Sequence, residues 1–244
     1  MDRKRWIIFI VLCVGLIIGL VMMSSKDKID VSKVDGTKIN TTSEITDHVF
    51  GKADSKVIVI EYADFQCPGC YAAYPQYKAV GEQYKDQVAF VFRNFPLSSL
   101  HPNALAAASA TEAAGLQGKY WEMHDLVFQN QPDWKTALAD QRDAKFESLA
   151  VQLGLNIDQF RSDIAGSKVS TKINTDRSIG IKMNVSSTPT IFINGSKATD
   201  TIVSDLMSGT GDQLRDRLDT LIKENGGTPP ARTLSLIHTD AADE

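Results

Sequence analysis

The run from residue 57 to residue 95 constrains the fold most, because a strand, a helix and a second strand follow one another there directly. VIVIEYADF is a short apolar run rich in β-branched residues, which is typical of a buried strand. CPGC follows, and then YAAYPQYKAVGEQYKDQ, a helical segment with Tyr77, Val80 and Tyr84 on one stripe. VAFVFRNF, at 88–95, is the second strand. The run predicts a βαβ unit with CPGC where its first strand meets its helix.

The rest of the chain indicates how this unit is completed. Residues 102–180 carry apolar side chains at helical spacing almost throughout. TIFINGSKAT predicts a hairpin, because Asn194-Gly195 is a strong turn signal. DQLRDRLDTLIKENGG predicts one last amphipathic helix. We therefore predict a three-layer α/β domain whose helical block is inserted between the βαβ half and the C-terminal hairpin and helix.

The N-terminus predicts a membrane anchor. After the basic residues 1–5, the run WIIFIVLCVGLIIGLVMM at 6–23 is uncharged and long enough to cross a bilayer as a helix. Basic residues in front of it predict a cytoplasmic N-terminus and a single-pass signal-anchor in the cell membrane. A cleaved signal peptide is the alternative. We expect 24–44 to be a polar linker, 45–226 an extracytoplasmic domain, and 227–244 a disordered tail.

Charge and histidine spacing bear on the kinds of site that the chain can hold. The net charge is −4 and no basic block follows the N-terminus, which argues against nucleic acid as a partner. A zinc site needs about four ligands, of which CPGC offers two, and no second pair accompanies it. We therefore predict no metal and no bound cofactor. The four histidines are scattered: His48, His101, His124 and His238.

Aromatic residues cluster after CPGC. Five aromatic residues could form a peptide-binding surface or could pack in the core, and core packing is the favoured interpretation. They are Tyr71, Tyr74, Tyr77, Tyr84 and Trp121. His124, which has no partner in a metal-binding motif, is interpreted as an ordinary helix residue.

The cysteines favour a reactive role for the motif. Cys13 lies in the apolar N-terminal run and is interpreted as an apolar filler there, which leaves Cys67 and Cys70 for the rest of the chain. Outside the cytoplasm disulfides persist. A bridge between these two cysteines would close a very small loop and constrain the unfolded chain little, so it is a poor structural staple.

The motif has the parts that thiol–disulfide exchange requires. Cys67 falls just before a helix and Pro68 in its first turn, where the missing N–H is harmless. A thiolate at Cys67 would face free backbone N–H groups and the positive end of the helix dipole, which lowers a cysteine pKa. Cys70, one turn further on, would be the resolving thiol. Gly69 and Pro68 add no charge that opposes the thiolate.

Glu61 and Pro189 are further candidates. Glu61 is a lone carboxylate in an apolar strand, where burial would raise its pKa and let it take and return the proton of Cys70. The alternative is a glutamate at a strand edge, pointing to solvent. Pro189 precedes the strand TIFIN. A cis bond there is rare by base rate, and proline is also an ordinary way to begin a strand.

Taken together, CPGC after VIVIEYADFQ, Pro75, the helical insertion and TPTIFING resemble the thioredoxin superfamily, and specifically its DsbA-like, membrane-anchored thiol–disulfide oxidoreductases. The resemblance covers about 45–224. It implies a thioredoxin fold with a helical insertion, a kink at Pro75, and Thr188-Pro189 as a cis-proline loop that packs on the active-site disulfide and binds substrate. The best-known member has His where this chain has Gly69.

The same resemblance implies roles and partners. Cys67 would be the nucleophile, Cys70 the resolving thiol and Glu61 the buried acid, with the Cys67–Cys70 disulfide as the redox group. The expected function is disulfide formation in exported, thiol-containing proteins, with reoxidation by a membrane partner. Two alternatives stay open: a reductase or isomerase of the same fold, and a non-catalytic binding module for exported chains.

Overall fold

The computed structural model describes residues 6, 9–10, 12–15, 30–41 and 46–232. The chain divides into two compact units, Met1–Lys33 and Val34–Glu244. Within the described part of the chain, no helix combines the length and the apolar character needed to cross a bilayer. Most of the predicted anchor at 6–23 lies outside the described residues, so the anchor stays a prediction.

A five-stranded mixed sheet forms the centre of the second unit, in the order β1-β3-β2-β4-β5. β2 is parallel to β3, and the other neighbouring pairs are antiparallel. β2 is the middle strand, and in it Glu61 lies between Phe92 of β3 and Ile191 of β4. The strands are β1 (Val49–Gly51), β2 (Ile58–Ala63), β3 (Ala89–Asn94), β4 (Thr190–Ile193) and β5 (Ser196–Lys197).

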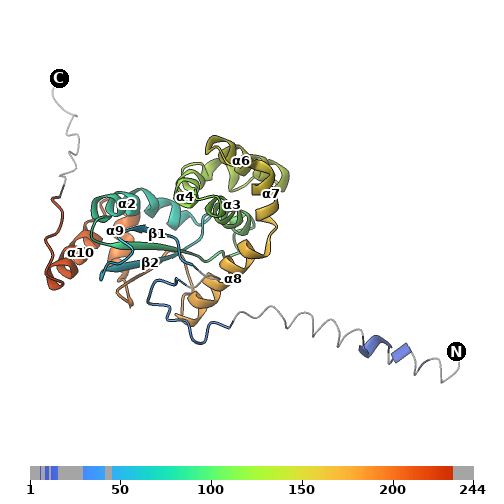
Figure 1. Cartoon of the computed structure of the whole chain (residues 1–244), viewed down its shortest axis with the longest axis horizontal. Helices are drawn as coiled ribbons and strands as arrows, with labels where there is room; N and C mark the ends of the chain where they lie inside the picture. The colour runs from blue at the N-terminus through green and yellow to red at the C-terminus, as the bar shows by residue number, and fades with distance from the viewer. Residues whose placement is uncertain (1–5, 7–8, 11, 16–29, 42–45, 233–244) are drawn as a thin grey trace. The chain divides into compact units, whose positions relative to one another are not determined.

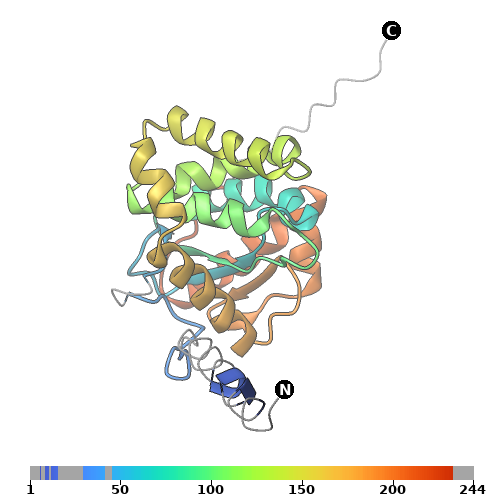
Figure 2. The same cartoon turned by 90° about the vertical axis from the view of Figure 1, so that its right-hand side faces the viewer.

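Helices cover both faces of this sheet (Figures 1 and 2). On one face α2 (Pro68–Tyr84), α9 (Asp200–Ser208) and α10 (Asp212–Glu224) share an apolar core with the sheet. On the other face α8 (Ser167–Lys182) packs so closely that a Cβ on Gly180 would meet the ring of Phe95 at 2.7 Å.

The remaining helices form the insertion, drawn in green, olive and gold in Figures 1 and 2. They are α3 (Ala104–Leu116), α4 (Tyr120–Gln129), α5 (Gln131–Trp134), α6 (Ala139–Gln152) and α7 (Ile157–Ile164). Their core includes Trp134 and Phe146, and it continues to Phe65 and to Cys67 and Cys70 of the CPGC motif. The insertion therefore packs against the candidate site.

The predicted βαβ unit, the helical block and the C-terminal hairpin and helix are confirmed. The last part of the predicted helical block forms α8, which packs on the sheet and is therefore one of the layers of the α/β domain. Two elements were missed. β1 has only three residues, too few for a periodic pattern, and α9 begins at Asp200, in a stretch for which no element was predicted. The Thr199 hydroxyl accepts a hydrogen bond from the Ile202 N–H at its start, and Gly209, at φ 114°, ends it.

The predicted domain boundaries need correction at both ends. In the predicted linker 24–44, residues 34–41 belong to the folded unit. The buried Arg93 guanidinium donates hydrogen bonds to the carbonyl oxygens of Gly36 (2.8 Å) and Lys38 (2.7 Å). Polar composition suggested a tether, but here the backbone satisfies a buried cation.

At the C-terminal end, residues 227–232 were predicted to begin a disordered tail. They are hydrogen-bonded instead: Gln83 donates to the Ala231 carbonyl at 2.9 Å, and Arg232 pairs with Asp219 at 2.8 Å. Residues 233–244, the rest of that tail, lie outside the described residues.

Candidate active site

Cys67 is the N-cap residue of α2, and Pro68 occupies the first turn, as the sequence predicts. The Cys67 N–H donates to the Asp64 carbonyl at 3.0 Å, which closes the turn between strand and helix. Both motif cysteines are free thiols. Cys67 retains 8% of its surface exposed against 1% for Cys70, so Cys67 is the thiol that another molecule can reach.

The surroundings of Cys67 favour its thiolate. A hydrogen bond from the Cys70 thiol lowers the pKa of Cys67 to about 5, against the opposing effect of burial. The backbone N–H groups of Gly69 and Cys70 lower it further. Those N–H groups lie in the first turn of α2, where they have no partner within the helix. The Cys67 pKa thus lies below neutral pH, which favours the thiolate form.

The two groups behind Cys67 show the opposite behaviour. Burial raises the pKa of Cys70 well above its usual range, and the hydrogen bond to Cys67 and the charges of Cys67 and Glu61 add to that rise. Burial also raises the pKa of Glu61 to about 8, with a further contribution from the Cys67 charge. The structure thus brings Glu61 under the motif as a carboxylic acid that is mostly protonated at pH 7.

The segment before β4 lies against the motif. The peptide bond between Thr188 and Pro189 is cis. Cys67 Sγ lies 3.4 Å from the Thr188 carbonyl oxygen, to which it can donate only when it is protonated, while the Thr188 hydroxyl is buried and has no partner among the described residues. A Cβ on Gly69 would lie 3.4 Å from both Pro189 Cδ and Met207 Sδ. Every predicted site residue is therefore gathered at one point, and their roles stay predictions.

Two amide side chains, neither of them predicted from the sequence, hold the loop before Cys67. Gln131 donates from Nε2 to the carbonyl oxygens of Phe65 (2.8 Å) and Cys67 (3.3 Å). The Gln66 side chain accepts from the Asn103 N–H at 2.6 Å. Nothing in the sequence distinguishes Gln131 from a surface glutamine, because its role depends on α5 packing against the loop.

The aromatic residues mostly form core, as favoured by the sequence analysis. Tyr74, Tyr77 and Tyr84 are buried, whereas Tyr71 is exposed. His124 is a buried helix residue whose ring lies edge-on to Phe92, with centroids 4.7 Å apart. In the part of the chain that the structure describes, no cluster of residues has the composition of a metal site.

The fold and the site define a class: an α/β protein with a dithiol at the N-terminus of a helix, beside a cis-proline segment. Comparison with known families agrees, because the family model for thioredoxin matches residues 43–210, more than half of the chain. The chain belongs to the thioredoxin family.

Two solved structures share this fold. The thiol-disulfide exchange protein alpha-DsbA2 from Wolbachia pipientis aligns with a TM-score of 0.61 at 23% identity, over 78% of this chain and 93% of that one. Oxidised BdbD from Bacillus subtilis aligns with a TM-score of 0.60 at 22% identity, over 72% and 92% of the respective chains. The fold of this chain is thus DsbA-like.

Curated relatives have a different name. The chain is 38% identical over 151 residues to the Na(+)/H(+) antiporter NhaA 1 of Mycolicibacterium vanbaalenii, a match that covers 61% of this chain and 23% of the antiporter. The chain therefore spans about a quarter of the length of the curated relatives that it matches.

Proposed function

We propose that this protein is a thiol–disulfide oxidoreductase that forms disulfide bonds in exported proteins, with Cys67 and Cys70 as its redox-active pair. The observation that carries the proposal is the contrast between the two thiols. Cys67 has a pKa of about 5 and can be reached, whereas Cys70 is buried with a raised pKa. One thiol is therefore suited to attack and leaving, and the other to resolution.

The cycle begins from the Cys67–Cys70 disulfide. A substrate thiolate attacks Cys67 Sγ, the Cys67–Cys70 bond breaks, and Cys70 leaves as a thiolate that takes a proton from Glu61. A second substrate thiolate then attacks the substrate sulfur of the mixed disulfide, and Cys67 leaves as a thiolate. The substrate has lost two electrons to the enzyme, and a membrane oxidant must remove them to restore the disulfide.

Two features support the oxidative direction. A thiol of low pKa is a good leaving group, so the mixed disulfide is released readily from Cys67. The stabilised Cys67 thiolate also favours the dithiol form of the enzyme, which makes its disulfide a stronger oxidant. Gly69 is the feature that works against this direction, because a cationic or hydrogen-bonding residue there would stabilise the thiolate further.

The proposed location is the outer side of a cell membrane, with residues 6–23 as a single-pass anchor and the N-terminus in the cytoplasm. The uncharged run after a basic N-terminus supports it. A location outside the cytoplasm also suits a disulfide-forming enzyme. Exported, thiol-containing proteins are the proposed substrates, and no cofactor beyond the disulfide is needed.

Oxidation of a reduced, unfolded model protein tests the function. The oxidised full chain should transfer its disulfide, and Cys67→Ser should lose the transfer completely. Cys13→Ser is the matched control and should keep it. A non-catalytic binding module would bind the model protein equally well with Cys67→Ser and would transfer no disulfide in any form, which would refute the proposal.

A further inference from the structure

The Tyr77 hydroxyl is a buried polar group whose place the fold alone does not explain. It has no hydrogen-bond partner among the described residues. Tyr77 follows Cys70 by seven residues, about two helical turns, so both lie on the same side of α2. Its ring packs edge-on against Phe90 of β3, with centroids 5.9 Å apart. Buried hydroxyls that lack a protein partner generally bind ordered water.

The same space holds Glu61. In the parallel register Val59 pairs with Phe90 and Glu61 pairs with Phe92, so these four side chains point to the face that α2 covers. Burial and then the charge of Glu61 raise the pKa of Tyr77, which is consistent with this proximity.

The other groups around Glu61 leave few routes for its proton. Its strand neighbours Phe92 and Ile191 are apolar. The other titratable groups that interact electrostatically with Glu61 are Cys67, Cys70 and, from α4, Tyr120. Both cysteines take part in the reaction itself, so neither can connect Glu61 with solvent independently of it.

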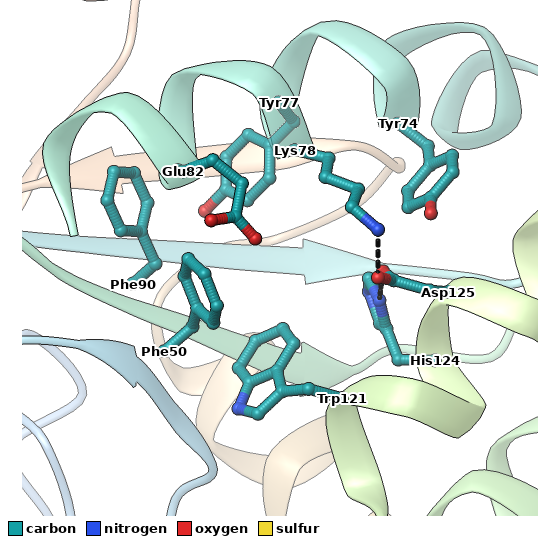
Figure 3. Close-up of a pocket in the computed structure, with 10 residues that line it drawn as sticks. Phe50, Tyr74, Tyr77, Lys78, Glu82, Phe90, Trp121, His124 and Asp125 are labelled. Atoms are coloured by element: carbon teal, nitrogen blue, oxygen red, sulfur yellow. Dashed lines mark hydrogen bonds and ion pairs between the residues drawn. The ribbon is translucent and has the colours of Figure 1, made fainter. Parts of the chain in front are cut away.

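Tyr77 also lines a small pocket (Figure 3). Its cavity volume of about 40 Å³ holds a few water molecules and is too small for a cofactor. His124 Nε2 is a second buried atom without a partner among the described residues, and it lines the same pocket. At the rim, the partly exposed Lys78 pairs with Asp125. The pocket is lined by Phe50, Tyr74, Tyr77, Lys78, Gly81, Glu82, Phe90, Trp121, His124 and Asp125.

We propose that the Tyr77 hydroxyl relays protons between Glu61 and the water of this pocket, and so reloads Glu61 after each round of thiol exchange. Tyr77 is then a positioning residue that acts through Glu61, and the proposal rests on the function proposed above. The hydroxyl makes no direct hydrogen bond to the carboxyl in the structure, so the proposed relay requires bridging water between the two groups.

The proton balance of the relay is simple. When Glu61 has given its proton to the Cys70 thiolate, a carboxylate remains. Tyr77 passes its O–H proton through the bridging water to that carboxylate while it accepts a proton from pocket water. No tyrosinate is formed and no electron moves. The net change is the transfer of one proton from solvent to Glu61, and reoxidation of the thiols reverses it.

Tyr77→Phe tests the relay, because it removes the hydroxyl and keeps the ring. The readout is the Glu61 titration in the reduced full chain, followed by carbon NMR of labelled glutamate carboxyls and assigned with Glu61→Gln. Wild-type Glu61 should titrate near pH 8. The variant should titrate about half a pH unit to one unit higher, since its carboxylate loses a hydrogen-bonded neighbour.

A kinetic readout accompanies it. The steady-state rate at which the protein passes a disulfide from an excess of a small disulfide oxidant to a small dithiol should fall severalfold in Tyr77→Phe, with its pH midpoint displaced in the same direction. Tyr84→Phe is the matched control: it removes another buried hydroxyl of α2, one that donates to Asp219 at 2.5 Å, and should change neither readout.

Circular dichroism on both variants establishes that they are folded. A Glu61 titration and a rate profile that are the same in Tyr77→Phe as in wild type would refute the relay. Failure of the proposed function looks different: the wild-type chain itself would transfer no disulfide, while the NMR titration would still report whether Tyr77 contacts Glu61.

Discussion

Two buried acidic residues on opposite faces of the sheet have opposite electrostatic surroundings. Asp47 lies on the α8 side beside Arg93 and Lys172, at 2.8 Å and 3.3 Å. Burial alone would raise the pKa of Asp47, but these two cations lower it overall. Glu61 lies on the α2 side, where burial and a nearby thiolate raise its pKa to about 8. One carboxyl is neutralised by pairing, and the other is left unpaired beside two thiols.

The difference separates a structural role from a chemical one. The Arg93 guanidinium also binds the Tyr62 hydroxyl and two carbonyls of residues 36–38, so it fastens the N-terminal segment to the sheet. Lys172 continues the network to Asp176 at 2.6 Å. Among the described residues no comparable cation acts on Glu61, so its carboxyl keeps its proton up to near-neutral pH and can exchange it there.

Arg93→Met should have the largest effect on stability. It leaves Asp47 buried with one cation fewer, and losing one partner of a buried ion pair destabilises by about 3–5 kcal/mol. The measurement is urea unfolding at pH 7. Arg232→Met is the control: its ion pairs are at the surface and should contribute about 1 kcal/mol or less. Equal losses of unfolding free energy in the two variants would contradict the claim that the buried ion pair contributes more than the surface ion pairs.

Glu61→Gln should change the stability in the opposite direction and raise the free energy of unfolding. Because its pKa is raised from 4.5 to about 8 on folding, Glu61 lowers stability progressively as the pH rises between those values. pH 7 lies about 2.5 units above the pKa of 4.5 in the unfolded chain, and this span corresponds to about 3 kcal/mol of lost stability. The reduced variant should therefore be more stable than wild type by roughly that amount. Unfolding measured from pH 4 to pH 8 should give curves that meet at the acid end. A variant that is less stable at every pH would show that Glu61 is paired after all.

Cys67→Ser should have the smallest effect on stability, and only in the reduced protein. The depressed pKa of Cys67 contributes stability that is fully present at high pH and is lost as the pH falls through about 5. Because Cys67 is partly open to solvent, we expect a loss of only about 1–2 kcal/mol at pH 7. Near pH 4 the variant and wild type should unfold together. A difference that persists there would point to lost packing as its cause.

The sequence predicts the local parts of the site well, for a physical reason. Glu61, Cys67 and Cys70 lie within ten residues, and a strand followed directly by a helix leaves little freedom in how they are placed. Pro189 is distant in sequence, and only the family resemblance indicated its position. The strand pattern also explains why Glu61 is buried, since it alternates with residues that face α8.

Contacts between distant segments could not be predicted in this way. Met207 reaches Gly69 only because α9 packs on α2. Gln131 supports the Cys67 loop only because of where α5 lies. The start of the folded unit at Val34 depends on a buried arginine in β3, whose need for carbonyl partners has no local signature. Polar composition therefore misplaced that boundary.

The central claim, that the Cys67 thiolate drives an oxidative exchange, can be tested by one combined titration. The reduced full chain is titrated for thiolate absorbance, and the same protein is equilibrated across glutathione redox buffers. We predict a Cys67 pKa near 5 and a reduction potential well above the glutathione poise. A pKa near 7 with a thioredoxin-like potential of about −270 mV would contradict the claim and make the protein a reductase or isomerase.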